Sequence, residues 1–204
     1  MPEQEKNTMD FQVFGTRPKN AIWLGDQPYA LRNDCQAGQW KVGDDDYRGK
    51  EIEISIIRVA RLFGSLGKAT NTFWLQVWFV PAPSCTILPA NTVCITYLKT
   101  RSLSQFSQKI TELLADGEPA RGIFKAGFQK HSNDLGNYYS VSWDWRDRRT
   151  QDEQDQLEQI AVFLQSEPVF IDMVATKSLI STDGLSPAEM TQLIQSAATQ
   201  DLFA

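Results

Sequence analysis

The chain has 204 residues, 42% of them hydrophobic, and a formal net charge of −5 at pH 7. That length suits one sizeable core with an appendage rather than two full domains. No run approaches the roughly 18 consecutive apolar residues of a membrane span, and the polar opening MPEQEKNTMD is unlike a signal peptide, so we expect a soluble, cytoplasmic protein with no membrane partner.

The first strong signal along the chain is a long hairpin. Apolar and polar residues alternate over 51–62 with the period of a strand. The sequence GSLG (64–67) supplies a turn, and FWLQVWFV (73–80) supplies the second strand. A loop with three prolines follows from Pro81 to Pro89, and TVCITYL (92–98) predicts a third strand.

The hydrophobic period then becomes helical. Apolar residues recur at helical spacing over 102–117, and Gly117 is placed to end the helix. Two more strands, 122–128 and 138–145, flank the turn-rich HSNDLGN. This order of elements is expected of an OB-fold, a five-stranded Greek-key barrel with a helix between its third and fourth strands. We therefore predict a mainly β fold with an OB-fold-like barrel, and an unrelated α+β sheet is the alternative.

The tail predicts two amphipathic helices. Thr150 and Glu153 form a capping box, after which the helix would bury a stripe of Leu157, Ile160, Ala161 and Leu164. Ser186, Pro187 and Glu189 begin the second helix, whose apolar stripe is Met190, Leu193, Ile194 and Ala197. The intervening EPVFIDMVATKSLI fits either a helix or a buried strand. We expect the stripes to pack on the barrel or on a second copy of the chain.

Charge divides the chain at the same places. Residues 1–46 carry 5 Lys/Arg and 8 Asp/Glu, residues 47–149 carry 14 and 8, and residues 150–204 carry 1 and 9. A basic middle before an acidic tail is typical of chains that meet a polyanion with one part, although solvation of separate faces is the alternative. We predict an N-terminal arm (1–46) that adds strands to the barrel or covers its face, an OB-like nucleic-acid-binding domain (47–149) and an acidic helical extension (150–204).

Catalytic and metal-binding patterns are weak. GSLGKAT (64–70) has too few residues between its glycines for a phosphate loop and joins two strands. The only histidine, His131, lies near Asp134 without a nucleophile signature, and the acidic run 44–46 lacks the spacing of a calcium loop. Cys35, Cys85 and Cys94 fit buried free thiols. We expect no enzyme, metal or cofactor, and an enzyme centred on His131 is the least favoured alternative.

Alternation over 73–80 separates two faces. Phe73, Leu75, Val77 and Phe79 form an apolar face, which leaves Trp74 and Trp78 on the other. These tryptophans would stack on bases, or else pack against the N-terminal segment or tail helices. The expected phosphate-binding cations surround that second face. They are Arg58, Arg61, Lys68, Lys99, Arg101, Lys125 and Lys130.

The last predicted strand has its own two faces. In NYYSVSWDWRDRR (137–149), the residues Tyr139, Val141, Trp143 and Trp145 share one face, which we assign to the core. Tyr138 and Arg146 lie on the opposite, polar face and are candidate ligand contacts.

Three stretches carry a family resemblance. YRGKEIEISIIRV, TYLKTRSLSQF leading into a helix, and YYSVSWDWR make residues 47–149 similar to the single-stranded-DNA-binding proteins of phages and plasmids, which are built on OB-folds. The resemblance implies binding of single strands without sequence preference during replication or recombination. The end QDLFA is similar to the acidic, phenylalanine-bearing tips by which such proteins contact partners, but it has a single acid, Asp201, and ends in Ala204, so that role is not carried over.

We therefore predict a non-catalytic protein that binds single-stranded DNA by electrostatic capture and aromatic stacking. RNA is left open as a ligand, and the C-terminal helices or exposed tryptophans offer a route to homo-oligomers. The alternative function is an interaction or assembly protein that buries its tryptophans against a partner.

Overall fold

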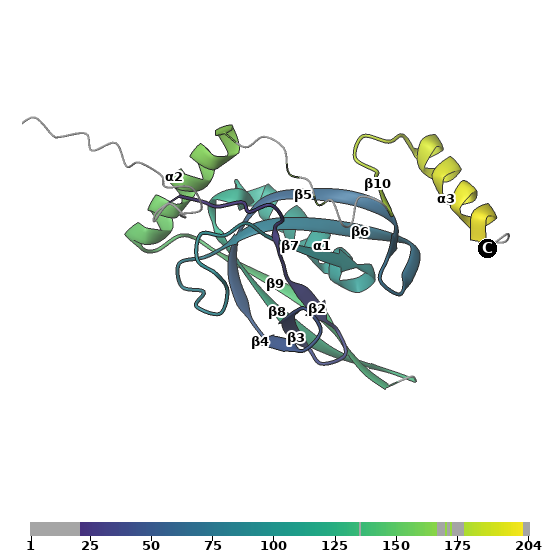
Figure 1. Ribbon diagram of the computed structural model, residues 1–204, viewed down its shortest axis with the longest axis horizontal. Coiled ribbons are helices and arrows are strands. Elements are labelled where there is room, and N and C mark those ends of the chain that lie inside the picture. The colour runs from purple at the N-terminus through teal and green to yellow at the C-terminus, as the bar shows by residue number, and fades with distance from the viewer. Residues whose placement is uncertain (1–20, 135, 167–169, 171, 173–177, 202–204) are drawn as a thin grey trace, which may run out of the picture.

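The computed structural model describes residues 21–134, 136–166, 170, 172 and 178–201. In this part of the chain the fold is mainly β with three α-helices (Figure 1). Within it, no helix is both long and apolar enough to cross a membrane. Three sequence features lie partly outside the described residues, namely the first 20 residues of the N-terminal arm, most of EPVFIDMVATKSLI and the last three residues of QDLFA.

The central elements occur in the predicted order. They are β5 (Ile52–Leu66), β6 (Ala69–Pro81), β7 (Cys94–Lys99), α1 (Thr100–Asp116), the 3-10 turn η1 (Pro119–Arg121), β8 (Ile123–Asn133) and β9 (Gly136–Arg146). The first hairpin is longer than predicted, because β5 continues past Gly64 and the chain reverses at Gly67 and Lys68. A hairpin turn therefore accounts for GSLGKAT. Gly117 ends α1, where its amide donates to the Leu113 carbonyl (3.1 Å).

The strands form an open sheet. Its order is β1-β7-β6-β5-β8-β9, with β1 (Tyr29–Ala30) at one edge and β10 (Leu179–Ser181) paired to β5. No strand pairing joins β7 to β9 in the described chain, so the predicted closed five-stranded barrel is not confirmed. The N-terminal segment spans this opening, because the Leu31 amide donates to the Ile95 carbonyl (2.9 Å) and the Tyr139 amide donates to the Cys35 carbonyl (2.8 Å).

The same N-terminal segment also enters the core. It forms a second sheet of three strands, β2 (Arg32–Asp34), β3 (Gln39–Val42) and β4 (Asp46–Gly49). Trp40 of β3 is 0% exposed within the main core, and its indole Nε1 donates to the Ala126 carbonyl (3.2 Å). Because a buried tryptophan removes a large apolar area from water and here also satisfies its N–H, it anchors the small sheet to β8.

Strand β6 is buried on both faces over most of its length. We call the side of Leu75, Val77 and Phe79 the inner face. These residues join the main core with Phe106 of α1 and with Val141 and Trp143 of β9, as predicted for that side of β9. The opposite side, which carries Trp74, Gln76 and Trp78, is the outer face, and separate clusters cover it.

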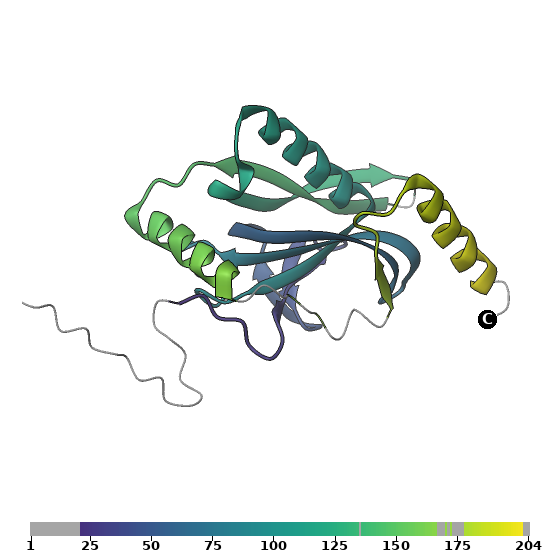
Figure 2. The ribbon, with the colours of Figure 1, turned by 90° about the horizontal axis from the view of Figure 1, so that it is seen from above.

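The tail helices begin where their caps predict. Helix α2 (Gln151–Ser166) follows Thr150, whose hydroxyl accepts the Glu153 amide (3.3 Å), and α3 (Pro187–Asp201) follows Ser186, whose amide donates to the Glu189 carboxylate (2.7 Å). The predicted α2 stripe is partly wrong, because Ala161 and Leu164 are exposed. The residues buried by α2 are Glu153, Gln156, Ile160 and Phe163. Figure 2 shows α2 and α3 at opposite ends of the molecule.

Candidate nucleic-acid interface

The two tryptophans expected to stack on bases lie inside the protein. Trp78 is 0% exposed and Trp74 is 6% exposed, so neither indole can receive a base. Trp78 packs with Ile22 of the N-terminal segment, Phe163 of α2 and Phe170, whose ring centroid is 5.2 Å from its own. The prediction of Trp74 and Trp78 as stacking platforms is corrected in favour of its alternative, packing against the N-terminal segment and the tail.

Hydrogen bonds hold this cover on the outer face. The indole of Trp78 donates to Gln76 (2.8 Å), the Gln76 amide donates to the Tyr97 hydroxyl (2.8 Å), and that hydroxyl donates to Asp172 (2.5 Å). Burial, followed by the hydrogen bond to Asp172, raises the pKa of Tyr97, so the phenol stays protonated as a donor. The polar groups of the outer face are therefore satisfied by the chain itself.

Two predicted cations also belong to the outer face. The Arg58 guanidinium lies 5.9 Å from the centroid of Phe170, and the Lys99 ammonium lies 5.4 Å from that of Trp74. Both side chains are exposed, and both cover aromatic rings in cation–π geometry. They lie apart from the cations of the inner face.

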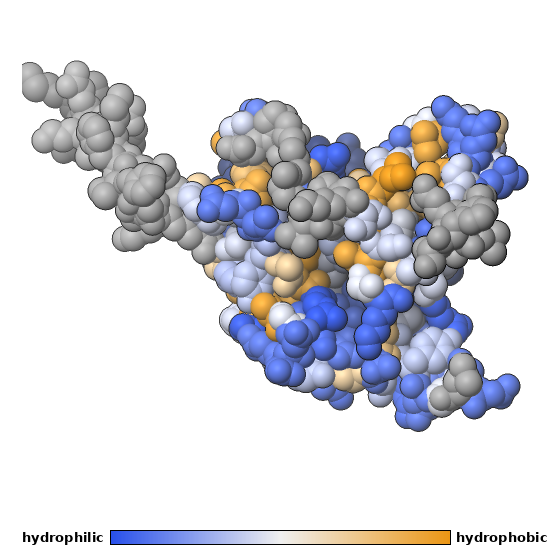
Figure 3. All heavy atoms as spheres, turned by 45° about the vertical axis from the view of Figure 1, so that its right-hand side comes forward, coloured by the Kyte–Doolittle hydropathy of each residue, from blue (hydrophilic) through white to orange (hydrophobic). Residues whose placement is uncertain are grey.

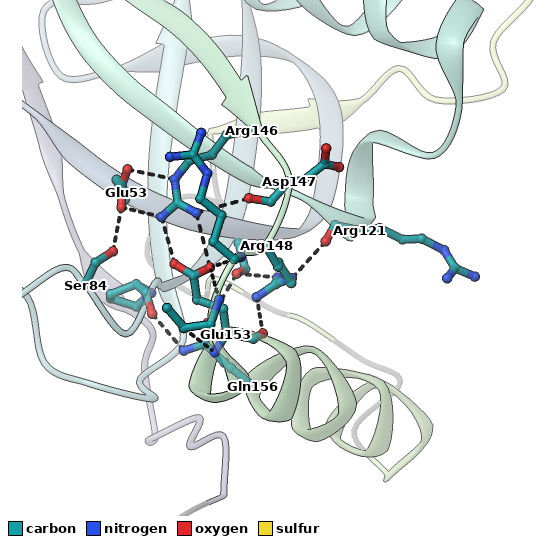
Figure 4. A network of polar contacts seen from close by, with 12 residues as sticks. Glu53, Ser84, Arg121, Arg146, Asp147, Arg148, Glu153 and Gln156 are labelled. Atoms are coloured by element: carbon teal, nitrogen blue, oxygen red, sulfur yellow. Dashed lines mark hydrogen bonds and ion pairs between the residues drawn. The ribbon is translucent and has the colours of Figure 1, made fainter.

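Two other predicted cations are paired with carboxylates. Lys125 lies 2.9 Å from Glu51 in an exposed pair. Arg146 donates to both Glu53 and Glu153 at 2.8 Å (Figure 4), and its side chain is 19% exposed. Hydrogen bonds to these carboxylates raise the pKa of Arg146. The prediction of Arg146 as a ligand contact is therefore corrected, because this guanidinium joins α2 to β5.

The partners of Arg146 belong to a larger buried network. Glu153, which is 3% exposed, also accepts the Arg149 amide (2.6 Å), and the hydrogen bonds from Arg146 contribute most to lowering its carboxyl pKa to about 2. Arg148, which is 8% exposed, donates to Ser55 (2.8 Å) and to the Glu153 carbonyl (2.6 Å). Figure 4 shows these groups converging where α2 begins. The network is structural and offers no free charge to a ligand.

Besides Arg58 and Lys99, four more predicted cations are exposed and have no carboxylate within ion-pair distance of their side chains among the described residues. These are Arg61, Lys68, Arg101 and Lys130. Arg61 is paired with Leu75 across β5 and β6 and so lies on the inner face, and Lys68 lies in the turn of that hairpin. Arg101, in the first turn of α1, donates to the Tyr138 hydroxyl (2.8 Å). Lys130 of β8 lies opposite Tyr139.

Two exposed apolar side chains flank a buried phenylalanine on the inner face, beside Arg61. Ile180 lies opposite Phe63, and Phe63 lies opposite Phe73, so the three side chains share one face of β10, β5 and β6. Ile180 is 54% exposed, Phe73 is 37% exposed and Phe63 between them is buried, with the two phenylalanine centroids 4.9 Å apart. Figure 3 shows apolar side chains among hydrophilic ones on the side of the molecule that carries α3. We call Ile180, Phe63 and Phe73 the inner-face strip.

Sequence reasoning missed Phe73 as an exposed aromatic. Alternation assigned it to the core with Leu75, and that assignment to a face is correct. The beginning of β6 extends beyond the core, however. Phe73 therefore lies on the core-facing side of the strand but is only partly covered by other side chains. The polar run Thr70, Asn71 and Thr72 just before it was the available signal.

A pocket of about 380 Å³ opens next to Phe73, between the beginning of β6 and the beginning of α1. The pocket is lined by Asn71, Thr72, Phe73, Thr100, Leu103 and Ser104. Arg101 directly follows one of these residues in α1. The pocket therefore lies between the exposed ring of Phe73 and the first turn of α1, whose Arg101 is directed toward Tyr138 of β9.

His131 has a different environment from the one predicted. Its Nε2 lies 2.7 Å from the Ser140 hydroxyl, and its ring lies against Tyr138 with centroids 5.1 Å apart. Desolvation and the charge of Arg101 lower the pKa of His131, which favours the neutral ring at pH 7. Ser140 is 1% exposed, so a substrate cannot reach its oxygen, and the pair gives no support to a nucleophilic dyad.

The described residues contain no cluster of three or more His, Cys, Asp or Glu side chains that could hold a metal ion. The three cysteines, all within the described chain, form no disulfide, and burial raises the pKa of the Cys35 and Cys85 thiols, which disfavours the reactive thiolate. No protein-family model, curated protein or solved structure matched the chain in comparisons with known proteins.

Proposed function

We propose that the chain binds single-stranded DNA without sequence preference, by electrostatic capture followed by stacking on the inner-face strip. One observation carries the proposal. The exposed ring of Phe73 shares one face of β5 and β6 with Arg61, and the side chains of Arg61, Lys68 and Arg101 form no ion pair among the described residues. Any base can stack on an aromatic ring, and phosphates bind mobile cations without reading sequence.

The strand order supports an OB-like arrangement. Strand β5 lies between β6 and β8, with β7 beyond β6 and β9 beyond β8, which is the order of an OB-fold opened between its third and last strands. OB-folds commonly bind nucleic acid on the face of their second and third strands. The corresponding outer face of β6 and β7 is covered here, so we place the interface on the inner side. A role in replication or recombination is part of this proposal.

Fluorescence anisotropy with a labelled oligo-dT of about 12 nucleotides tests the proposal. The wild type is compared with a triple variant, Arg61→Gln, Lys68→Gln and Arg101→Gln. Arg121→Gln is the matched control, because Arg121 is equally exposed but paired with Glu118. For a single strand, each lost phosphate contact should lower the slope of log affinity against log salt by about 0.7.

Two results would sink the proposal. One is no binding by the wild type at low salt, and the other is a triple variant whose salt slope equals that of Arg121→Gln. Oligo-U in parallel decides between DNA and RNA, since tighter binding of oligo-U would replace DNA by RNA as the ligand.

A second candidate function is assembly, and α3 favours it. None of the α3 side chains that the structure describes is buried, and Ile194 of its apolar stripe is 43% exposed. Burial of that stripe against another copy would remove apolar surface from water. Light scattering over a concentration series tests this candidate, with Ile194→Gln expected to shift any oligomer toward monomer. A monomer at all concentrations would eliminate it.

A further inference from the structure

The pocket beside Phe73 is an open depression with room for one small planar group. Its volume of about 380 Å³ is near the lower end of the roughly 300–1,000 Å³ found for small-molecule sites. Phe73 of β6 supplies an aromatic wall and Leu103 of α1 an aliphatic one. A flat ring is the group that gains most from such walls, because stacking uses its whole face.

The remaining lining is polar but uncharged. It consists of Asn71, Thr72, Thr100 and Ser104. The Thr72 hydroxyl donates to the Thr70 carbonyl (3.1 Å) and the Ser104 hydroxyl donates to the Thr100 carbonyl (3.3 Å). A hydroxyl that has given its proton to a carbonyl still has acceptor lone pairs. These two oxygens therefore suit a ligand edge that carries N–H donors, such as the imino or amino edge of a nucleobase.

Two residues with positive φ line the same pocket, and one of them, Thr100, is strained. Asn71 and Thr100 both have φ near the left-handed region, at 47° each, and they are two of only three non-glycine residues with positive φ in the described chain. For a β-branched residue such as Thr100 this conformation is unfavourable. Strain of this kind persists where the surrounding structure enforces it, and it is frequent at ligand sites.

Cations lie outside the pocket. Arg101 follows Thr100 in the sequence, but its side chain donates to Tyr138 of β9 and does not line the cavity, while Lys99 lies on the outer face over Trp74. The lining is neutral, so the pocket would hold the ring and leave an attached phosphate outside.

From these observations we infer that the pocket binds one nucleobase at a time, stacked on Phe73 with its N–H edge toward Thr72 and Ser104. This inference rests on the proposed binding of single strands and specifies it: the strand is held by a base inserted beside α1, in addition to charge along its backbone. The ligand class is a pyrimidine or purine nucleotide, free or within a strand.

Saturation-transfer NMR with thymidine monophosphate tests the pocket directly, with abasic deoxyribose phosphate as the ligand control. Phe73→Leu keeps an apolar side chain and removes the ring. Tyr47→Leu is the matched control, because Tyr47 is an exposed aromatic of β4, 48% exposed, that does not line the pocket. We expect saturation of the base protons with the wild type and Tyr47→Leu, its loss with Phe73→Leu, and no transfer to the abasic compound. Equal transfer to the abasic compound, or unchanged transfer with Phe73→Leu, would overturn the inference.

Anisotropy with oligo-dT separates this inference from the proposed function. The Phe73→Leu variant should bind about tenfold or more weakly than Tyr47→Leu. If Phe73→Leu binds as tightly as the wild type, the base pocket is wrong and strand binding stands. If the wild type binds no oligo-dT while thymidine monophosphate still depends on Phe73, strand binding is wrong and the pocket stands.

The hydrogen-bonding edge has its own test. Methylation of N3 removes the imino donor of thymidine monophosphate, so the methylated nucleotide should bind several-fold more weakly to the wild type. The Thr72→Val variant, which lacks the acceptor, should lose most of that difference. Equal affinity of the two nucleotides for the wild type would overturn the proposed orientation of the base edge.

Discussion

Replacing Glu153 by Gln should destabilise the protein strongly at neutral pH. This side chain is 3% exposed and accepts hydrogen bonds from the Arg146 guanidinium and from the Arg149 and Thr150 amides. The substitution keeps the shape and removes the charge that compensates Arg146. Removing one partner of a buried ion pair typically costs about 3–5 kcal/mol.

The pKa gives a second measure of the same effect. Lowering the carboxyl pKa from 4.5 to about 2 corresponds to about 3 kcal/mol of stabilisation at neutral pH. Because the folded-state pKa is depressed, this contribution is present above the unfolded value of 4.5 and is lost as the pH falls toward 2. The stability difference between wild type and Glu153→Gln should therefore shrink to about 1 kcal/mol near pH 3.

Urea unfolding followed by circular dichroism at neutral pH and near pH 3 measures this difference. Glu158→Gln is the matched control, because Glu158 is an exposed glutamate of the same helix, and it should change stability by less than about 0.5 kcal/mol. A loss of under 1 kcal/mol for Glu153→Gln at neutral pH, or a loss that does not depend on pH, would refute this account of how α2 is held.

Three further predictions concern the core and the cover of the outer face. Trp40→Ala should lower the free energy of unfolding by about 3–5 kcal/mol in urea titrations, because Trp40 is fully buried. A loss under 1 kcal/mol would contradict the role of Trp40 in anchoring the small sheet to β8. Trp78→Phe should lower stability and leave the affinity for oligo-dT unchanged, and the reverse pattern would restore the outer face as the interface. Gly64→Ala should make the C-terminal segment more sensitive to limited proteolysis than Gly67→Ala does. A β-carbon at Gly64 would collide with the Ser178 carbonyl, whereas one at Gly67 meets no atom within 4 Å; equal sensitivity would count against the docking of β10.

Local signals in the sequence predicted local structure well. The caps at Thr150 and Ser186 depend on residues three positions away, and both form. Alternation in β6 separated Leu75 and Val77 from Trp74 and Trp78 correctly, because the strand period fixes the faces. These features require no knowledge of the rest of the chain.

The candidate site depended on distant contacts that the sequence does not reveal. Alternation cannot say which of two apolar faces is covered, and the cover of Trp78 comes from Ile22 and Phe163, which lie far apart in the sequence. Likewise, the sequence gives no sign that Arg146 is paired, because its partner Glu53 lies 93 positions away. Phe73 became a site residue because its strand extends beyond the core, and neither composition nor period reports where a core ends.

Photocrosslinking tests the central claim, the position of the DNA on the inner face, most directly. An oligo-dT that carries bromodeoxyuridine is irradiated with the protein, and mass spectrometry assigns the crosslinked residue. The account predicts crosslinks at Phe73, which decrease as salt increases and disappear in the Phe73→Leu variant. Crosslinks at Trp74 or Trp78 with none at Phe73 would contradict it.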